Sequence, residues 1–304
     1  RVTHNSSGGG SVSCSASFNT GVSIGTLTTS RSFTLSTIPR VSDLALSKTS
    51  ISADGVDTVV ATATKKNNSF TDILTVSLAS YSKTITSGTA FTIPKEWINA
   101  ISGTSAIADV TVTTKSGNTV IGTNTAKLTV NAPDTIVPTV NSVTVSEAIT
   151  STKSAFGVFV TDISKLNVSV SASGVYGSTI QSVKTVFDNT TYDATSFQTS
   201  SISKSGTLNM VTTVTDSRGR SASYTKEITV YPYSAPKIIS ASSVSDGENT
   251  VVTVTGAVSP VMVDSTAKNT KTLKISYKSS TETEFANETT VEVADWSFAV
   301  SKTF

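Results

Sequence analysis

Polar and apolar residues alternate in short runs along most of the chain. Three of these runs lie at residues 126–130, 166–170 and 273–277, where every second residue is apolar and the residues between are Lys, Thr, Asn or Ser. A period of two residues places the apolar side chains on one face of a β-strand, and runs of about five to eight residues have the length of ordinary strands. The pattern therefore predicts strands with one buried face and one solvent face.

Turn residues separate these runs. Asp54-Gly55, residues 116–118 (SGN), residues 216–219 (DSRG) and Asp246-Gly247 all contain glycine or asparagine, which adopt positive φ angles readily. We interpret these segments as hairpin turns, so that consecutive strands pair with each other.

Residues 94–101 (PKEWINAI) carry the one helical pattern that we recognise. Pro94 stands at a first helical position, and apolar residues follow at spacings of three and four. We expect about two helical turns that connect one sheet to the other. Trp97 would then close an edge of the sandwich, and an exposed Trp97 that stacks on a ligand is the alternative.

Prolines mark the expected boundaries between modules. Five of the seven prolines form three clusters about 95 residues apart, the length of one immunoglobulin-like sandwich. Proline lacks the amide donor that a central strand needs and stiffens an extended connection. The sequence thus predicts an all-β fold of tandem immunoglobulin-like or fibronectin-like β-sandwich modules, at residues 1–40, 41–132, 133–235 and 236–304.

The first and last segments are expected to be parts of sandwiches. Strands expected from Val2 onward, at 11–18 and at 31–38 are too few to close a sandwich, so residues 1–40 are interpreted as its C-terminal part. These strands would pair with residues outside the sequence or with another chain. Residues 236–304 finish in a strand-like stretch and are interpreted as a truncated module.

Cys14 is the only cysteine, so the modules must hold together without an internal disulfide. It belongs to an alternating set with Val12, Ala16 and Phe18 that is expected to face a core. We therefore expect Cys14 to be a small buried hydrophobe rather than a reactive thiol.

The composition favours β-structure, and the fraction of charged residues is low. Ser and Thr make up about a third of the residues, and charged residues only 14% against about 25% in ordinary domains. With 23 basic and 21 acidic residues, the formal charge of +2 gives no field that would gather nucleic acid or anionic lipid. No apolar run approaches the roughly 20 residues of a membrane helix. We therefore expect neither nucleic acid nor membrane as a partner.

Residues with catalytic or metal-binding chemistry are sparse. His4 is the only histidine, which excludes a zinc site with several histidines. Any Ser-His-Asp triad would have to be built around His4. The glycines at 8–10 lead into a strand rather than a helix, so they indicate a flexible turn and no phosphate loop. Asp54 with Asp57, and Asp134 alone, are too few for a calcium site. We expect no cofactor, no metal and no enzymatic activity.

Two loops are candidates for facing a ligand. Tyr176 lies between Gly174 and Gly177, where its ring could stack on a sugar or fold back to cap the sandwich. Arg218 and Arg220 lie in the most highly charged turn, which is interpreted as a solvated hairpin tip with ligand binding as the alternative. The candidate ligand-facing residues are thus Tyr176, Arg218 and Arg220.

Several segments resemble a known family. Residues 4–6 (HNS) with the following glycines and strand, and residues 33–40 (FTLSTIPR), are similar to the end of the first sandwich in tail-associated minor structural proteins of streptococcal siphophages. Residues 156–166, 173–178 (SGVYGS), 213–221 (TVTDSRGRS) and 233–237 (YSAPK) are similar to later immunoglobulin-like modules of that family. The resemblance covers nearly the whole chain. It implies a role at the tail tip in host attachment and supplies no catalytic or ligand residue.

We therefore expect a non-catalytic structural protein of the phage tail tip or tail fibre. Its expected partners are other virion tail proteins and host cell-wall carbohydrate, and its expected location is the virion tail, acting outside the cell. A trimer or other homo-oligomer agrees with the incomplete first module, although no heptad repeat indicates a coiled coil. A bacterial cell-surface stalk or adhesin built from the same modules is the alternative.

Overall fold

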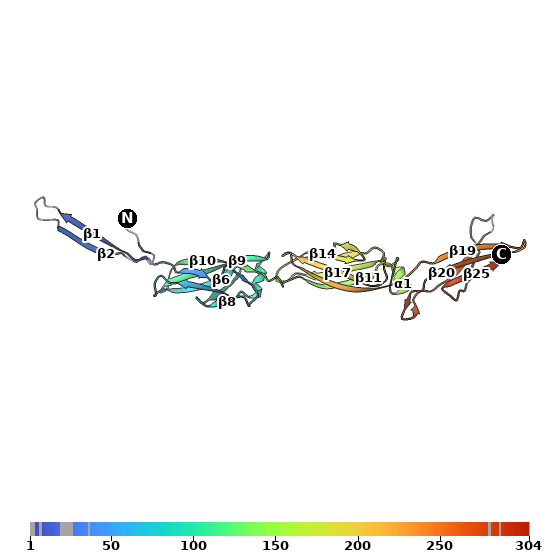
Figure 1. Cartoon of the computed structure of the whole chain (residues 1–304), viewed down its shortest axis with the longest axis horizontal. Coiled ribbons are helices and arrows are strands. Elements are labelled where there is room, and N and C mark those ends of the chain that lie inside the picture. The colour runs from blue at the N-terminus through green and yellow to red at the C-terminus, as the bar shows by residue number, and fades with distance from the viewer. Residues whose placement is uncertain are drawn as a thin grey trace. The chain divides into compact units, whose positions relative to one another are not determined.

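The structure, a computed structural model, describes residues 4–5, 8–18, 27–35, 37–278, 281–285 and 287–303. Strands dominate these residues, and the expected all-β architecture of immunoglobulin-like modules is confirmed (Figure 1). The chain divides into two compact units, residues 1–137 with 174–179, and residues 138–173 with 180–304. Within the described ranges, no helix has the length and apolar character needed to cross a bilayer.

The first unit begins with a two-stranded hairpin. β1 (Ser11–Phe18) pairs antiparallel with β2 (Leu27–Thr34), and neither pairs with another strand that the structure describes. At the base of the hairpin, the Ile38 amide donates to the carbonyl oxygen of Gly8 at 2.9 Å. Gly8 has a φ of +88°, and an added Cβ would lie 1.8 Å from the Ile38 carbonyl oxygen. Only glycine fits this close backbone contact at Gly8, and the flexibility expected of the glycine turn stays a prediction.

Cys14 is exposed, so the prediction of a buried cysteine is wrong. The alternation that motivated it is real, because β1 is a strand with Cys14 opposite Arg31 of β2. In the part of the chain that the structure describes, however, no second sheet covers this hairpin. The third expected strand, at 31–38, begins earlier, at Leu27, and ends at Thr34. The strand expected from Val2 lies outside the described residues.

A complete sandwich follows in the first unit. Its smaller sheet has the order β3 (Asp43–Leu46), β5 (Val59–Thr64), β8 (Ala90–Phe91). Its larger sheet has the order β4 (Ser50–Ser52), β10 (Thr119–Asn131), β9 (Ser105–Ser116), β6 (Thr71–Leu78), β7 (Tyr81–Ile85). The inward residues of both sheets form one core, and Val76, Val110 and Leu128 have no solvent exposure.

One of the connections between the two sheets is the predicted helix. It is a 3-10 helix, η1 (Lys95–Ala100), and it joins β8 of the smaller sheet to β9 of the larger sheet. Trp97 is buried, with its ring stacked against that of Tyr81 at a centroid distance of 5.7 Å. The interpretation of Trp97 as a residue that closes the sandwich is confirmed.

A second sandwich, in the second unit, repeats this topology. Its smaller sheet has the order β11 (Thr139–Glu147), β13 (Leu166–Ser173), β16 (Ser196–Gln198). Its larger sheet has the order β12 (Phe159–Val160), β18 (Ser221–Tyr231), β17 (Gly206–Asp216), β14 (Ile180–Phe187), β15 (Thr190–Tyr192). In both sandwiches the larger sheet combines a long hairpin, β9–β10 or β17–β18, with a short hairpin, β6–β7 or β14–β15.

A helix that the sequence did not predict lies in the second sandwich. α1 (Thr150–Phe156) has no side-chain cap at its start and ends at Gly157, which adopts a φ of +66°. Its sequence, TSTKSAF, has no helical spacing of apolar residues, and its one buried residue is the polar Thr152. The glycine that terminates the helix is the signal that sequence reasoning could have used.

The last part of the second unit contains smaller sheets. β19 (Lys237–Ser245), β20 (Thr250–Ala257) and β25 (Ser297–Thr303) form an antiparallel sheet with β20 in the centre. β23 (Leu273–Tyr277) pairs with β24 (Asn287–Val291), and β21 (Met262–Val263) with β22 (Thr266–Ala267).

Hydroxyl groups pair across the outer faces of the sheets. Each pair joins a Ser or Thr of one strand to a Ser or Thr of its neighbour at 2.6–3.0 Å: Ser13–Ser32, Thr111–Thr125, Thr213–Ser223, Thr215–Ser221, Ser240–Thr255 and Thr253–Ser301. This arrangement explains how a chain with few charged residues presents polar outer faces.

Replacement of Trp97 by alanine is expected to destabilise the first sandwich by about 3–5 kcal/mol, because a large buried ring would leave a cavity. In calorimetry of the whole protein, one unfolding transition should then shift down by more than about 10 °C. Ile107→Thr, a substitution at an exposed position of β9, should leave that transition within about 2 °C. A W97A transition that matches the wild type would contradict the buried role of Trp97.

Candidate functional site

The carboxylates that make hydrogen bonds serve mainly as caps for turns. Glu147 accepts from the Ile149 and Lys165 amides, and Asp246 accepts from the Glu248 and Asn249 amides. Among the described residues, no three His, Cys, Asp or Glu side chains are placed to share a metal ion. The carboxylates of Glu147 and Asp246 therefore act on backbone amides.

Asp54 and Asp57 show this role most fully. Asp54 Oδ1 accepts from the Val56 and Asp57 amides at 2.7 Å, and Asp57 accepts from the Ser52 and Thr58 amides and pairs with Lys48. The two backbone amides lower the pKa of Asp54, and Lys48 with the Ser52 amide lowers the pKa of Asp57. Both carboxylates are thus used to fix the turn between β4 and β5.

The turn between β17 and β18 is not a solvated hairpin tip. Asp216 is fully buried, and its Oδ1 accepts from the Arg218 amide at 2.9 Å and from the Arg220 amide at 3.0 Å. Arg218 is also buried, with 6% of its surface exposed, and Arg220 is half-buried. Burial lowers the pKa of Arg218, while the nearby Asp216 charge opposes that shift. The solvated interpretation is wrong for Arg218, because the turn folds around an internal carboxylate.

Tyr176 lies in a tight turn that is part of the first compact unit. Its φ is +47°, and the Ser178 amide donates to the Val175 carbonyl oxygen at 3.1 Å. Gly174 is required, since an added Cβ would lie 2.0 Å from the Ser178 carbonyl oxygen. The Tyr176 ring is half-buried and packs against the hydrophobic core of the first unit. The proposed role of Tyr176, Arg218 and Arg220 in ligand binding stays a prediction.

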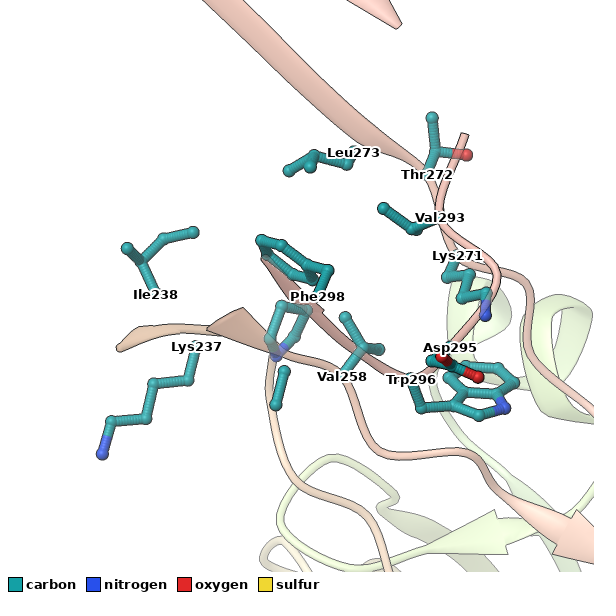
Figure 2. A pocket seen from close by; sticks show the side chains of 12 residues that line it. Lys237, Ile238, Val258, Lys271, Thr272, Leu273, Val293, Asp295, Trp296 and Phe298 are labelled. Atoms are coloured by element: carbon teal, nitrogen blue, oxygen red, sulfur yellow. The ribbon is translucent and has the colours of Figure 1, made fainter. Parts of the chain in front are cut away.

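An apolar hollow of about 130 Å³ lies in the last part of the second unit. In Figure 2, Leu273 and Val293 lie opposite Phe298 and Ile238 across this hollow, while the Lys237 side chain points away. Lys271 lies 4.9 Å from the centroid of the Trp296 ring and donates to the Ala294 carbonyl oxygen.

A sugar site usually places several polar groups at defined positions in a pocket, whereas most of this lining is aliphatic or aromatic. The hollow therefore has the character of a sandwich interior and suits apolar protein side chains.

The hollow is one end of a larger apolar surface, which we call the open face. It consists of six side chains on one face of the β19–β20–β25 sheet: Ile238, Ala241, Val252, Val254, Phe298 and Val300. The Phe298 ring lies across Gly256, where an added Cβ would approach it to 2.4 Å. Ile238 and Ala241 are exposed, and the other four side chains are half-buried.

The open face corresponds to a surface that is covered in the two complete sandwiches. There, the central strands β5 and β13 of the smaller sheets bury Val59, Ala61, Leu166 and Val168 almost completely. The long hairpin of the larger sheet lies opposite these residues in the same core. In the last part of the second unit, the described residues form the smaller sheet and the β23–β24 hairpin but no long hairpin. Among the described residues, the open face is thus an apolar sheet surface that borders the hollow and is less buried than its counterparts in the two complete sandwiches.

Comparison with known proteins places the chain in a family. Residues 1–303 match the model of a family described as "Siphovirus protein of unknown function (DUF859)". The chain belongs to this family. No curated protein sequence shows significant similarity to it. The resemblance to siphophage proteins seen in the sequence is thus confirmed at the level of the siphovirus family.

Solved structures with a similar fold include modular proteins of diverse origin. Fibronectin(III)-like modules of Clostridium thermocellum CbhA share 10% sequence identity, with 62% of this chain and 95% of that chain covered and a TM-score of 0.24. A Ca²⁺-stabilised adhesin with which an Antarctic bacterium binds ice shares 17% identity, with 96% of this chain and 73% of that chain covered and a TM-score of 0.31. The human Desmocollin-1 ectodomain shares 11% identity, with 96% of this chain and 63% of that chain covered and a TM-score of 0.23. TM-scores this low give no support to a shared function.

Replacement of Asp57 by asparagine tests the role of the carboxylates. Because the folded-state pKa of Asp57 is lowered, its charge contributes stability that is complete above the unfolded pKa of about 3.9 and is lost as the pH falls through the folded value. We expect D57N to lower the unfolding midpoint of the first sandwich at pH 7, by an amount that shrinks as the pH falls below about 3.9.

The matched control is D109N, which removes an exposed ion pair with Lys127 in the same sandwich. Such a pair contributes little to stability, so the D109N midpoint should follow the wild type at every pH. A difference between D57N and the wild type that is equally large at pH 2 would rule out the carboxylate charge as its cause.

Proposed function

We propose that this protein is a non-catalytic structural component of the siphovirus tail tip or tail fibre that takes part in attachment to the host cell surface. The observation that carries the proposal is the match of residues 1–303 to a siphovirus family. The proposed location is the virion tail, and the protein acts outside the cell. A streptococcal host is the one that the sequence resemblance favours.

The architecture supports a structural role. Successive β-sandwiches with cores of Val, Leu and Ile side chains fill most of the described residues. The carboxylates described above accept hydrogen bonds from backbone amides of their own turns, which supports a structural role for them. Incubation of host wall polymer with the protein should therefore release no new reducing ends.

The proposed partners are other virion tail proteins and host cell-wall carbohydrate. Attachment does not require a deep pocket, because repeated copies on one virion can bind by many weak contacts. The net charge of +2 and low charge density give no basis for binding nucleic acid or membrane.

Labelled antibody fragments against the protein test the location. On purified virions of the phage that encodes it, electron microscopy should show label at the end of the tail, and preincubation with the fragments should reduce adsorption to host cells. Fragments against the major capsid protein are the control and should leave adsorption unchanged. Virions that lack the protein, or label on the surface of uninfected bacteria, would overturn the proposal and favour the adhesin alternative.

A further inference from the structure

A small hollow of about 220 Å³ lies at the end of the β14–β15 hairpin in the second sandwich. Asp188, Thr190 and Tyr192 line it from the hairpin, and residues 199–203 (TSSIS) line it from the connection between β16 and β17. We call this hollow the serine pocket. In contrast to the apolar hollow described above, most of its lining residues carry polar side chains.

The serine pocket lies where the first sandwich is filled by aromatic rings. Tyr81 and Thr190 are equivalent, because each begins the second strand of the short hairpin and pairs with the last residue of the first strand. Tyr81 stacks on Trp97 of η1, whereas Thr190 is a small residue. The connection at 199–205, which takes the place of η1 and its flanking residues, contains no aromatic side chain. The second sandwich therefore has space where the first has rings.

The Asp188 carboxylate joins the two walls of the serine pocket. Asp188 and Asn189 adopt φ angles of +46° and +63° and form the two-residue turn of the hairpin. One carboxylate oxygen of Asp188 accepts from the Ser203 amide at 2.7 Å and from the Ser203 hydroxyl at 2.9 Å. The hairpin turn and the connection are thus held to each other.

Backbone hydrogen bonds fix the connection to the rest of the sandwich. The Thr199 amide donates to the Leu166 carbonyl oxygen at 2.9 Å, and the Ile202 amide donates to the Ser164 carbonyl oxygen at 3.1 Å. The side chains of Thr199 and Ile202 are buried. The serine pocket is therefore pre-formed, and a ligand would not have to order these segments when it binds.

Hydroxyl groups are the main polar groups that the serine pocket offers. The Tyr192 hydroxyl accepts from the Ser200 amide at 3.3 Å, so its own hydrogen can be donated to a ligand. The Tyr192 ring is stacked on that of Phe197 at a centroid distance of 4.3 Å, which fixes its position. Thr190, Ser200 and Ser201 are exposed, so a ligand can reach their hydroxyls from solvent.

These groups match the chemistry of a sugar. Sugar hydroxyls both donate and accept hydrogen bonds, as do those of Ser, Thr and Tyr, and the oxygens of Asp188 can each accept more than one. The carboxylate disfavours an anionic ligand. Phe187 and Ile202 are buried beneath the polar groups and supply apolar surface for the C–H groups of a sugar ring.

We propose that the serine pocket binds one residue of a neutral sugar. Its volume lies below the roughly 300–1,000 Å³ of pockets for drug-sized ligands, which limits the ligand to about one ring. Binding at a single pocket of this size is weak, and repeated copies on a virion would strengthen it. The assignment of the sugar to the host cell wall rests on the function proposed above, whereas the binding itself does not.

Nuclear magnetic resonance of the isotope-labelled full chain tests this binding. Glucose, galactose, N-acetylglucosamine and N-acetylgalactosamine are titrated separately to high millimolar concentration. At least one of them should shift the amide signals of Ser200 and Ser203 in a saturable way. The proposal is overturned if no sugar shifts these signals, or if calcium chloride shifts them and no sugar does.

A matched pair of variants in β15 locates the bound sugar. T190Y places a tyrosine at the position equivalent to Tyr81, so its ring should fill the serine pocket and abolish the saturable shifts. T191Y adds the same ring on the opposite face of β15, where Thr191 pairs with the exposed Val186, and should bind the sugar as the wild type does. Equal binding by T190Y and the wild type would place the sugar elsewhere and overturn the site.

The milder variant Y192F covers the case in which T190Y fails to fold. It removes only the hydroxyl that donates to the ligand, while the ring can still stack on Phe197. We expect Y192F to keep the thermal midpoint within a few degrees and to weaken sugar binding about twofold to tenfold, as the loss of one hydrogen bond does. A Y192F chain that binds the sugar as tightly as the wild type would overturn the site as proposed.

Failure of the sugar site and failure of the tail function give different results. If labelled fragments bind at the tail end and the purified chain binds no sugar, the sugar site is overturned and the tail function stands. If the chain binds a sugar in the serine pocket and purified virions lack the protein, the site is supported and its assignment to host attachment is overturned.

Discussion

The fold depends on the burial of one apolar face of each sheet against the apolar face of another. Every Å² of apolar surface removed from water contributes roughly 25 cal/mol, and a chain with one cysteine has no internal disulfide to supplement that energy. In the two complete sandwiches this burial is nearly total at the central positions, as at Val76 and Leu166. At β1–β2 and at the open face, where the described residues supply no complete second layer, the same kind of residue is exposed or half-buried.

The sequence contains most of the information about the strands. The alternation at 126–130, 166–170 and 273–277 identifies parts of β10, β13 and β23, and the pattern at 94–101 identifies both the crossover helix and the burial of Trp97. These features are local, because a side-chain period or a proline acts within a few residues. α1 was not predicted, because its residues have no helical spacing of apolar side chains. The glycine at its end, Gly157, is the one local signal of a helix there.

The candidate site could not be predicted in the same way. Alternation reports that a strand has an apolar face but not whether another sheet covers it, so Cys14 and Val254 have the same local pattern as buried residues such as Val112. Arg218 shows the opposite case. Its position in a charged turn indicates an exposed tip. Asp216 caps the Arg218 and Arg220 amides within that same turn, but the burial of Asp216 and Arg218 is a tertiary property that the sequence does not reveal.

The hydroxyl pairs on the outer sheet faces have a consequence for the conditions that these modules tolerate. A contact such as Thr111–Thr125 or Thr213–Ser223 carries no net charge, so dissolved ions do not screen it as they screen an exposed ion pair. Neither hydroxyl titrates at the acidities that protonate carboxylates. The cross-strand contacts of the outer faces should therefore persist from fresh water to concentrated brine.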